Sequence, residues 1–190
     1  MIELNTNKVR LSLPPQSDSI VDGEGLRTVI WFQGCPHNCL GCHNKDTQNF
    51  KGGKVVPIEE MISLLANLDF QDGLTFSGGE PFAQPEALAV LAREAKRLNL
   101  NVWSYTGYTY EELIVLSKQN AYILEALKNI DVLVDGRFKL EEKSLNVKFR
   151  GSKNQRIINV PKSLKQGRAV LVQKYRKEKE ITVAYQEQFV

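Results

Sequence analysis

LRTVIWFQGCPHNCLGCHN, residues 26–44, joins an apolar run directly to a loop that contains every cysteine of the chain. Residues 26–32 have the continuous β-branched and aromatic composition of a buried strand. Cys35, Cys39 and Cys42 follow it with the spacing C-x3-C-x2-C. Three thiols directly after a strand predict a functional loop at the carboxyl end of that strand.

Further apolar runs alternate with segments of helical periodicity. Because strand and helix alternate, we expect βαβ units and a mainly parallel sheet with helices outside it. A complete eight-stranded barrel takes about 250 residues, and this chain has 190. We therefore expect an α/β fold, an open, partial (β/α) barrel of mainly parallel strands, in one domain over residues 1–190. Strands are expected at 73–77, 101–106, 131–135 and 155–160, with 169–172 as a sixth candidate, and helices from Pro57, from Pro85 and over 110–129 with a break near Asn120.

Composition narrows the classes of function. The net charge of +3 is too small to indicate a nucleic-acid partner. No apolar run approaches the roughly 20 residues that cross a bilayer, and residues 1–10 lack a signal-peptide core. We therefore expect a cytoplasmic protein that binds neither nucleic acid nor membrane. Three cysteines are an odd number, which disfavours a disulfide framework.

The cysteine loop predicts a metal site. Soft thiolates select zinc, copper(I) or iron–sulfur. A [4Fe–4S] cluster held by three cysteines keeps one iron open, whereas a Cys3His zinc site would need His37 or His43 as its fourth ligand. We favour the cluster, because structural zinc sites usually draw their ligands from two separated segments. For His37 we expect a solvated position in the loop.

Three other polar turns also follow predicted strands. They are SGGEP (77–81), YTGY (105–108) and DGR (135–137). In open parallel sheets the carboxyl ends of the strands carry the chemistry, so all four loops are expected at one edge. The carbonyl groups of Gly78 and Gly79, with Glu80 nearby, would suit a ligand ammonium group.

The cysteine motif followed by GGEP resembles the radical S-adenosylmethionine superfamily. More narrowly, the chain resembles the activating proteins of the anaerobic, class III ribonucleotide reductase, over about residues 22–160. Residues 161–190, expected as a C-terminal strand and tail, carry no further motif. The resemblance rests on DGEGLR (22–27), QGCPHNCLGCHN (33–44), TFSGGEPF (75–82), YTGYTYEEL (105–113), DVLVDGRF (131–138) and FRGSKNQRI (149–157).

The resemblance implies two cofactors and assigns residues to them. Cys35, Cys39 and Cys42 would ligate three irons of a [4Fe–4S] cluster, and the open iron would bind the amino and carboxylate groups of S-adenosylmethionine. The remaining contacts to S-adenosylmethionine would come from Gly41, Cys42 and His43 on the adenosyl side, Gly78, Gly79 and Glu80 at the methionine ammonium group, and a further site at Asp135 and Arg137, where related activases have lysine in place of Arg137.

The implied reaction is the reductive cleavage of S-adenosylmethionine to a 5′-deoxyadenosyl radical, which takes a hydrogen atom from a glycine of the large reductase subunit. Such a reaction needs a flavodoxin- or ferredoxin-type electron donor. Two alternatives stay open on the sequence alone. One is an activase of another glycyl-radical enzyme, such as pyruvate formate-lyase, and the other is a non-enzymatic zinc-binding interaction module.

Overall fold

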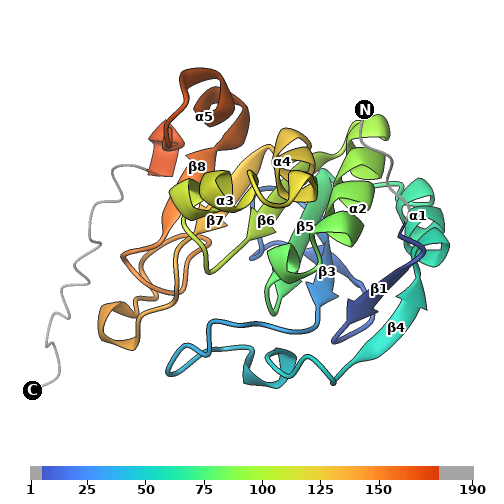
Figure 1. Ribbon diagram of the computed structural model, residues 1–190, viewed down its shortest axis with the longest axis horizontal. Coiled ribbons are helices and arrows are strands. Elements are labelled where there is room, and N and C mark those ends of the chain that lie inside the picture. The colour runs from blue at the N-terminus through green and yellow to red at the C-terminus, as the bar shows by residue number, and fades with distance from the viewer. Residues whose placement is uncertain (1–5, 176–190) are drawn as a thin grey trace, which may run out of the picture.

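The computed structural model describes residues 6–175. Its centre is one eight-stranded sheet in which β2 pairs with β3 outside the path β4-β1-β3-β5-β6-β7-β8 (Figure 1). The sheet is not closed into a barrel. The strands are β1 (Lys8–Leu11), β2 (Gln16–Ser19), β3 (Arg27–Phe32), β4 (Lys54–Pro57), β5 (Gly73–Gly78), β6 (Asn101–Tyr105), β7 (Val132–Asp135) and β8 (Arg156–Asn159).

The four central strands, β3, β5, β6 and β7, are mutually parallel. Their carboxyl ends therefore lie at the same edge of the sheet, as the alternation of strands and helices predicts. The outer strands differ, since β1, β2, β4 and β8 all pair antiparallel. The fold is thus a mixed α/β sheet with a parallel centre, and its open form matches the expectation from chain length.

The helices lie along one face of the sheet (Figure 1). Asn120, the predicted break, accepts a hydrogen bond from the Tyr122 N–H and so begins a new helix. Gly167 ends the last helix in the left-handed conformation, at φ 66°. The helices are α1 (Ile58–Ala66), α2 (Pro85–Arg97), α3 (Tyr110–Leu116), α4 (Ala121–Lys128) and α5 (Val160–Gln166).

Alternation along each strand divides the apolar residues between two faces. Val102 and Leu133 belong to the main core beneath the helices. Their neighbours Trp103 and Val134 point the other way, into a smaller cluster with Ile157 on the face without helices. This second face forms the wall of the site described below.

Arg27, the first residue of β3, is fully buried. Its guanidinium donates to the carbonyl groups of Leu74 and Asn101 and to the Thr75 hydroxyl, and it lies 5.5 Å from the centre of the Trp103 ring. Burial lowers the pKa of Arg27 to about 10. Through these contacts one side chain ties together β3, β5 and β6 near their amino ends, opposite the edge that holds the polar loops.

Several sequence expectations need correction. Residues 169–172 form no strand, and only an isolated bridge joins Leu171 to Ile158. Helix α5 occupies the start of the segment expected as a strand and tail, and residues 176–190 of that tail lie outside the described residues. Strands β1, β2 and β4 were not predicted. Within residues 6–175, no helix has the length and apolar character needed to cross a membrane.

Candidate active site

A cavity of about 380 Å³ opens at the carboxyl ends of the central strands. All four polar loops predicted to meet there contribute to its lining. The residues that line it from these loops are Cys35, His37, Cys39, Cys42, His43, Asn44 and Gln48 after β3, Ser77, Gly78 and Gly79 at β5, Tyr105, Thr106 and Gly107 at β6, and Gly136 after β7.

The three cysteines have free thiols that are half-buried in this cavity. The first part of the loop is held by the backbone, since the Gly34 N–H donates to the Thr47 carbonyl at 2.7 Å and the Cys35 N–H to that of Gln48 at 3.0 Å. Burial raises the pKa of the Cys35 thiol to about 11 and raises that of Cys39. In the described part of the chain, no three Cys, His, Asp or Glu side chains already converge as metal ligands.

The chemistry of the lining fits an iron–sulfur cluster with a small polar ligand beside it. Three thiols supply the soft donors that such a cluster requires. The indole Nε1 of Trp31, in the wall of the same cavity, is buried and has no hydrogen-bond partner among the described residues. Buried polar groups are nearly always paired in folded proteins, so this N–H is open to a ligand.

The two histidines occupy different environments. The His43 ring lies 5.0 Å from the centre of the Phe138 ring and is exposed. The prediction of a solvated His37 is wrong, because its side chain is only 3% exposed and its Nε2 lies 2.8 Å from Oε2 of Glu80. The His37 ring is therefore occupied by an internal contact.

Glu80 lies behind the cavity wall, not in it. Its carboxylate is fully buried and accepts hydrogen bonds from within the chain, and Glu80 does not line the cavity. The adjacent turn is fixed to the cysteine loop, since the Gly79 N–H donates to the Phe32 carbonyl and the Glu80 N–H to that of Gly34, both at 2.8 Å. From its sequence position Glu80 is expected to meet a ligand ammonium group. In the structure its carboxylate is instead bonded within the chain and does not reach the cavity.

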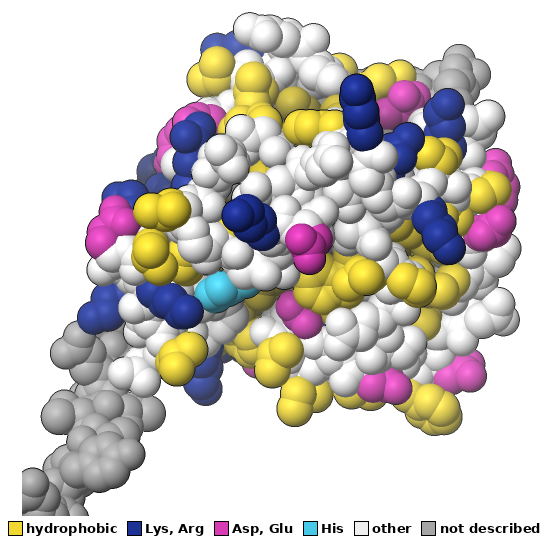
Figure 2. All heavy atoms as spheres, turned by 90° about the horizontal axis from the view of Figure 1, so that it is seen from below, with side chains coloured by type: hydrophobic (Ala, Val, Ile, Leu, Met, Phe, Trp, Pro, Cys, Tyr) yellow, Lys and Arg dark blue, Asp and Glu magenta, His cyan; other side chains and the backbone are white. Residues whose placement is uncertain are grey.

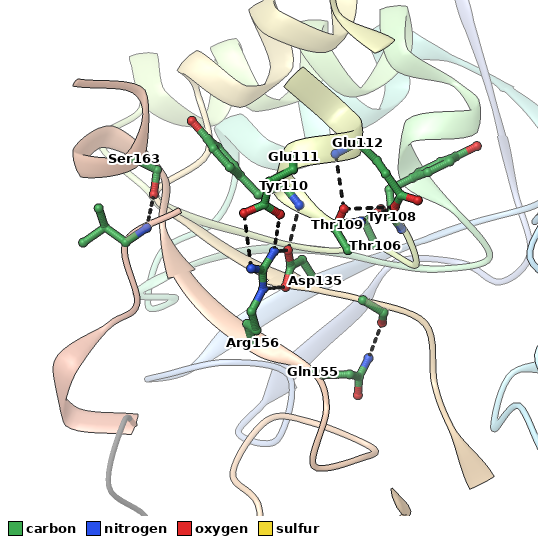
Figure 3. A network of polar contacts seen from close by, with 12 residues as sticks. Thr106, Tyr108, Thr109, Tyr110, Glu111, Glu112, Asp135, Gln155, Arg156 and Ser163 are labelled. Atoms are coloured by element: carbon green, nitrogen blue, oxygen red, sulfur yellow. Dashed lines mark hydrogen bonds and ion pairs between the residues drawn. The ribbon is translucent and has the colours of Figure 1, made fainter. Parts of the chain in front are cut away.

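Asp135 is also buried and directed away from the cavity. Figure 3 shows the Arg156 guanidinium between Asp135 and Glu111, with Arg156 Nη2 at 2.5 Å from Asp135 Oδ2 and 2.6 Å from Glu111 Oε2. The Tyr110 N–H also donates to Asp135, at 2.7 Å. Burial raises the pKa of Asp135, and the Arg156 guanidinium opposes that rise. Arg137 does not share this network and is exposed.

Sequence reasoning missed Trp31, which lies in the interior of β3 and lines the cavity. Tyr105, the last residue of β6, belongs to the predicted YTGY turn and also lines the cavity, and burial raises the pKa of its hydroxyl. The signal that could have identified Trp31 is the two-residue alternation of the strands. Trp31 has the strand register that faces away from the helices, as Trp103 does in β6. Asp22, within the DGEGLR motif, also lines the cavity.

Comparison with known protein sequences places the chain in a family. A family model described as a 4Fe-4S single cluster domain matches residues 21–158. The anaerobic ribonucleoside-triphosphate reductase-activating protein of Pasteurella multocida is 37% identical over 147 residues, which cover 72% of this chain and 89% of that protein. The protein of that name from Enterobacteria phage T4 is 35% identical over 145 residues, 72% of this chain and 86% of its own length. The chain belongs to this family of activating proteins.

This chain is also similar to an activating enzyme of a second kind. The pyruvate formate-lyase-activating enzyme of Clostridium pasteurianum is 38% identical over 122 residues, which are 61% of this chain but only 51% of that enzyme. The resemblance deduced from the motifs is confirmed, and so is the expectation of an iron–sulfur domain. The match to the 4Fe-4S family model, over residues 21–158, includes all four loops that line the cavity.

Proposed function

We propose that this chain activates an anaerobic ribonucleotide reductase by creating a glycyl radical on it, with S-adenosylmethionine bound beside a [4Fe–4S] cluster. The observation that carries the proposal is the meeting of three free thiols with the ends of β5, β6 and β7 in one cavity. The names of the relatives support the reductase as the target.

Cys35, Cys39 and Cys42 would hold the cluster, leaving one iron without a protein ligand. The surrounding chain supports this assignment at His37, because its Nε2 is already bonded to Glu80. Ligation requires thiolates, so the binding of the cluster would release the protons that burial holds on Cys35 and Cys39.

S-adenosylmethionine would lie between the cysteine loop and the end of β5. The backbone of Gly78 and Gly79 would meet its ammonium group, while Gly41, Cys42 and His43 would border its adenosyl part. We assign Glu80 to holding this turn in place. Of the further predicted pair we keep only Arg137 as a contributor, because the Asp135 carboxylate is occupied by Arg156 and the Tyr110 N–H. When bound, the two cofactors supply the one-electron chemistry that converts a glycine of the reductase into a radical.

The rim of the cavity suits a protein substrate. Leu40 in the cysteine loop is 80% exposed and Val21 is 70% exposed, and Leu140 and Leu145 are exposed on the segment after β7. Figure 2 looks at the side on which the cysteine loop lies in Figure 1 and shows hydrophobic side chains among charged side chains of both signs. We propose that the glycine-bearing loop of the reductase approaches here, and that a flavodoxin- or ferredoxin-type protein delivers the electron.

The test is chemical analysis of protein prepared without oxygen. We expect about four iron and four acid-labile sulfide per chain, and S-adenosylmethionine cleavage on reduction. Cys39→Ala should lose both properties, because two thiols cannot hold the cluster in place. The matched control is Ser17→Ala, the same kind of truncation at an exposed position of β2. Wild-type protein that holds one zinc ion and no sulfide would contradict the proposal.

The alternative target left open by the sequence is pyruvate formate-lyase, but the similarity to its activating enzyme covers only 51% of that enzyme, so we place it second. The two targets are distinguished by mixing the reduced protein and S-adenosylmethionine with each large enzyme in turn. Electron paramagnetic resonance then detects the glycyl radical. We expect the glycyl radical signal on the ribonucleotide reductase. A radical signal on pyruvate formate-lyase alone would contradict this assignment and make pyruvate formate-lyase the target.

A further inference from the structure

His37, which belongs to the cysteine loop, reaches deep into the protein. Its Nε2 lies 2.8 Å from Glu80 Oε2, and the two side chains are 3% and 0% exposed. The ring of Tyr108 meets the His37 ring edge-on, with 4.5 Å between centroids. Because the Glu80 oxygens act as acceptors in all their other contacts, we assign the proton of this contact to Nε2 of His37.

The Glu80 carboxylate accepts three further hydrogen bonds. Its Oε1 receives the Thr106 hydroxyl at 2.9 Å and the Phe82 N–H at 3.0 Å, and its Oε2 receives the Gly107 N–H at 2.8 Å as well as His37. A buried carboxylate is tolerated only when its lone pairs are satisfied in this way. Glu80 therefore joins three parts of the chain, the cysteine loop and the ends of β5 and β6.

The space for the His37 ring depends on Gly107. A Cβ atom at position 107 would lie 2.3 Å from Cδ2 of His37, which is far inside contact distance. The residues on either side of His37, Pro36 and Asn38, are exposed, as is Leu40. His37 is thus an inward-facing side chain in a loop whose neighbouring side chains face solvent.

We propose that His37 is a positioning residue for the cysteine loop. By donating to Glu80 it holds the loop against the ends of β5 and β6, so that Cys35 and Cys39 face the cavity before any metal arrives. The purpose that we give to this arrangement rests on the proposed function. The contact between His37 and Glu80 does not, because it is present in the metal-free chain. A loop fixed in advance loses less conformational entropy when its ligands are used.

Two substitutions separate the hydrogen bond from the ring. His37→Gln keeps an N–H donor close to the position of Nε2, whereas His37→Leu keeps a similar volume without a donor. Asn38→Gly is the control in the same loop, because Asn38 is exposed and its φ of 46° suits glycine. Gly107→Ala is a second route to the same result, since its added Cβ displaces the ring.

The first measurement is hydrogen exchange of residues 35–43 in the metal-free protein, with the unfolding transition as a check on the rest of the fold. His37→Leu and Gly107→Ala should speed exchange of these amides by about tenfold, the loss expected for a hydrogen bond to a charged group. His37→Gln and Asn38→Gly should stay close to wild type. Equal exchange in wild type and His37→Leu would overturn the proposal, and so would a failure of glutamine to rescue. If His37→Leu does not fold, the comparison of Gly107→Ala with His37→Gln decides in the same way.

The second measurement is the uptake of iron and sulfide on anaerobic reconstitution. We expect His37→Leu to take up cluster more slowly and to hold less of it, and His37→Gln to restore uptake. Full and rapid uptake by His37→Leu would contradict the positioning role while leaving the proposed function intact. Wild-type protein without sulfide would instead contradict the proposed function, and the exchange experiment would still decide whether His37 fixes the loop.

Discussion

At the scale of single residues, buried charges determine which side chains remain available to a ligand. Asp135 is fully buried against Arg156, whose own pKa is raised by Asp135 and Glu111. Loss of the guanidinium would leave a carboxylate without its counter-ion in the interior. Such uncompensated charges are among the most destabilising changes that one substitution can make.

We predict that Arg156→Met lowers the free energy of unfolding by about 3 kcal/mol, measured by urea denaturation of the metal-free protein. Adding Asp135→Asn should recover part of this loss, because no buried charge is then left unpaired. The control is Arg97→Met, since Arg97 is 64% exposed and its ion pair with Glu94 lies at the surface. An Arg156→Met protein as stable as the control would show that the ion pair is dispensable.

At the scale of secondary structure, local sequence signals identified most elements of the parallel centre. The strands expected at 73–77, 101–106 and 131–135 appear as β5, β6 and β7, and the break expected near Asn120 separates α3 from α4. Strands β1, β2 and β4 were missed because each has only four residues, and β2 and β4 are also largely exposed. Their pairing with the sheet, and not their own periodicity, makes them strands.

Helix α3 gives a prediction at this scale. Thr109 and Glu112 form a capping box at its start, and the Thr109 N–H, which donates to the Glu112 carboxylate, holds the pKa of that carboxyl below its usual value. A lowered pKa in the folded state adds stability above the unfolded pKa, and this contribution is lost as the pH falls through the folded value.

We therefore expect Glu112→Gln to lower the free energy of unfolding by about 0.5 kcal/mol at pH 7, and this difference from wild type to shrink as the pH is lowered to 3. Urea denaturation at the two pH values measures both. Glu141→Gln, at an exposed position outside the capping box, serves as the control. A difference that persists unchanged at pH 3 would exclude the carboxylate as its cause.

At the scale of the whole molecule, one sheet connects the site to the core. The main cluster of buried side chains runs from Val9 in β1 to Val160 at the start of α5. Arg27 ties three of the central strands together near the end opposite the cavity. We predict that the metal-free chain unfolds as a single domain.

The measurement uses the two tryptophans as separate probes. Trp31 borders the cavity and Trp103 lies in the second apolar cluster, so Trp103→Phe and Trp31→Phe each leave one reporter. Within each variant, the fluorescence and circular dichroism midpoints in urea should coincide. Separate transitions for the two signals would divide the chain into independent units.

The sequence by itself determined the chemistry and the local structure of this protein. The spacing of Cys35, Cys39 and Cys42 predicted an iron–sulfur domain, and the polar turns after successive strands predicted the edge of the sheet where the cavity opens. These features are legible because they depend on residues close together in the chain.

The tertiary structure alone decided which polar side chains face the cavity. Glu80 and Asp135 follow strands in the manner of ligand-binding residues, yet His37 and Arg156, 43 and 21 residues away in the chain, occupy their carboxylates. A buried charge is stable only when a hydrogen-bonding partner lies next to it. The packing of distant segments determines which residue becomes that partner, and no local pattern of sequence specifies it.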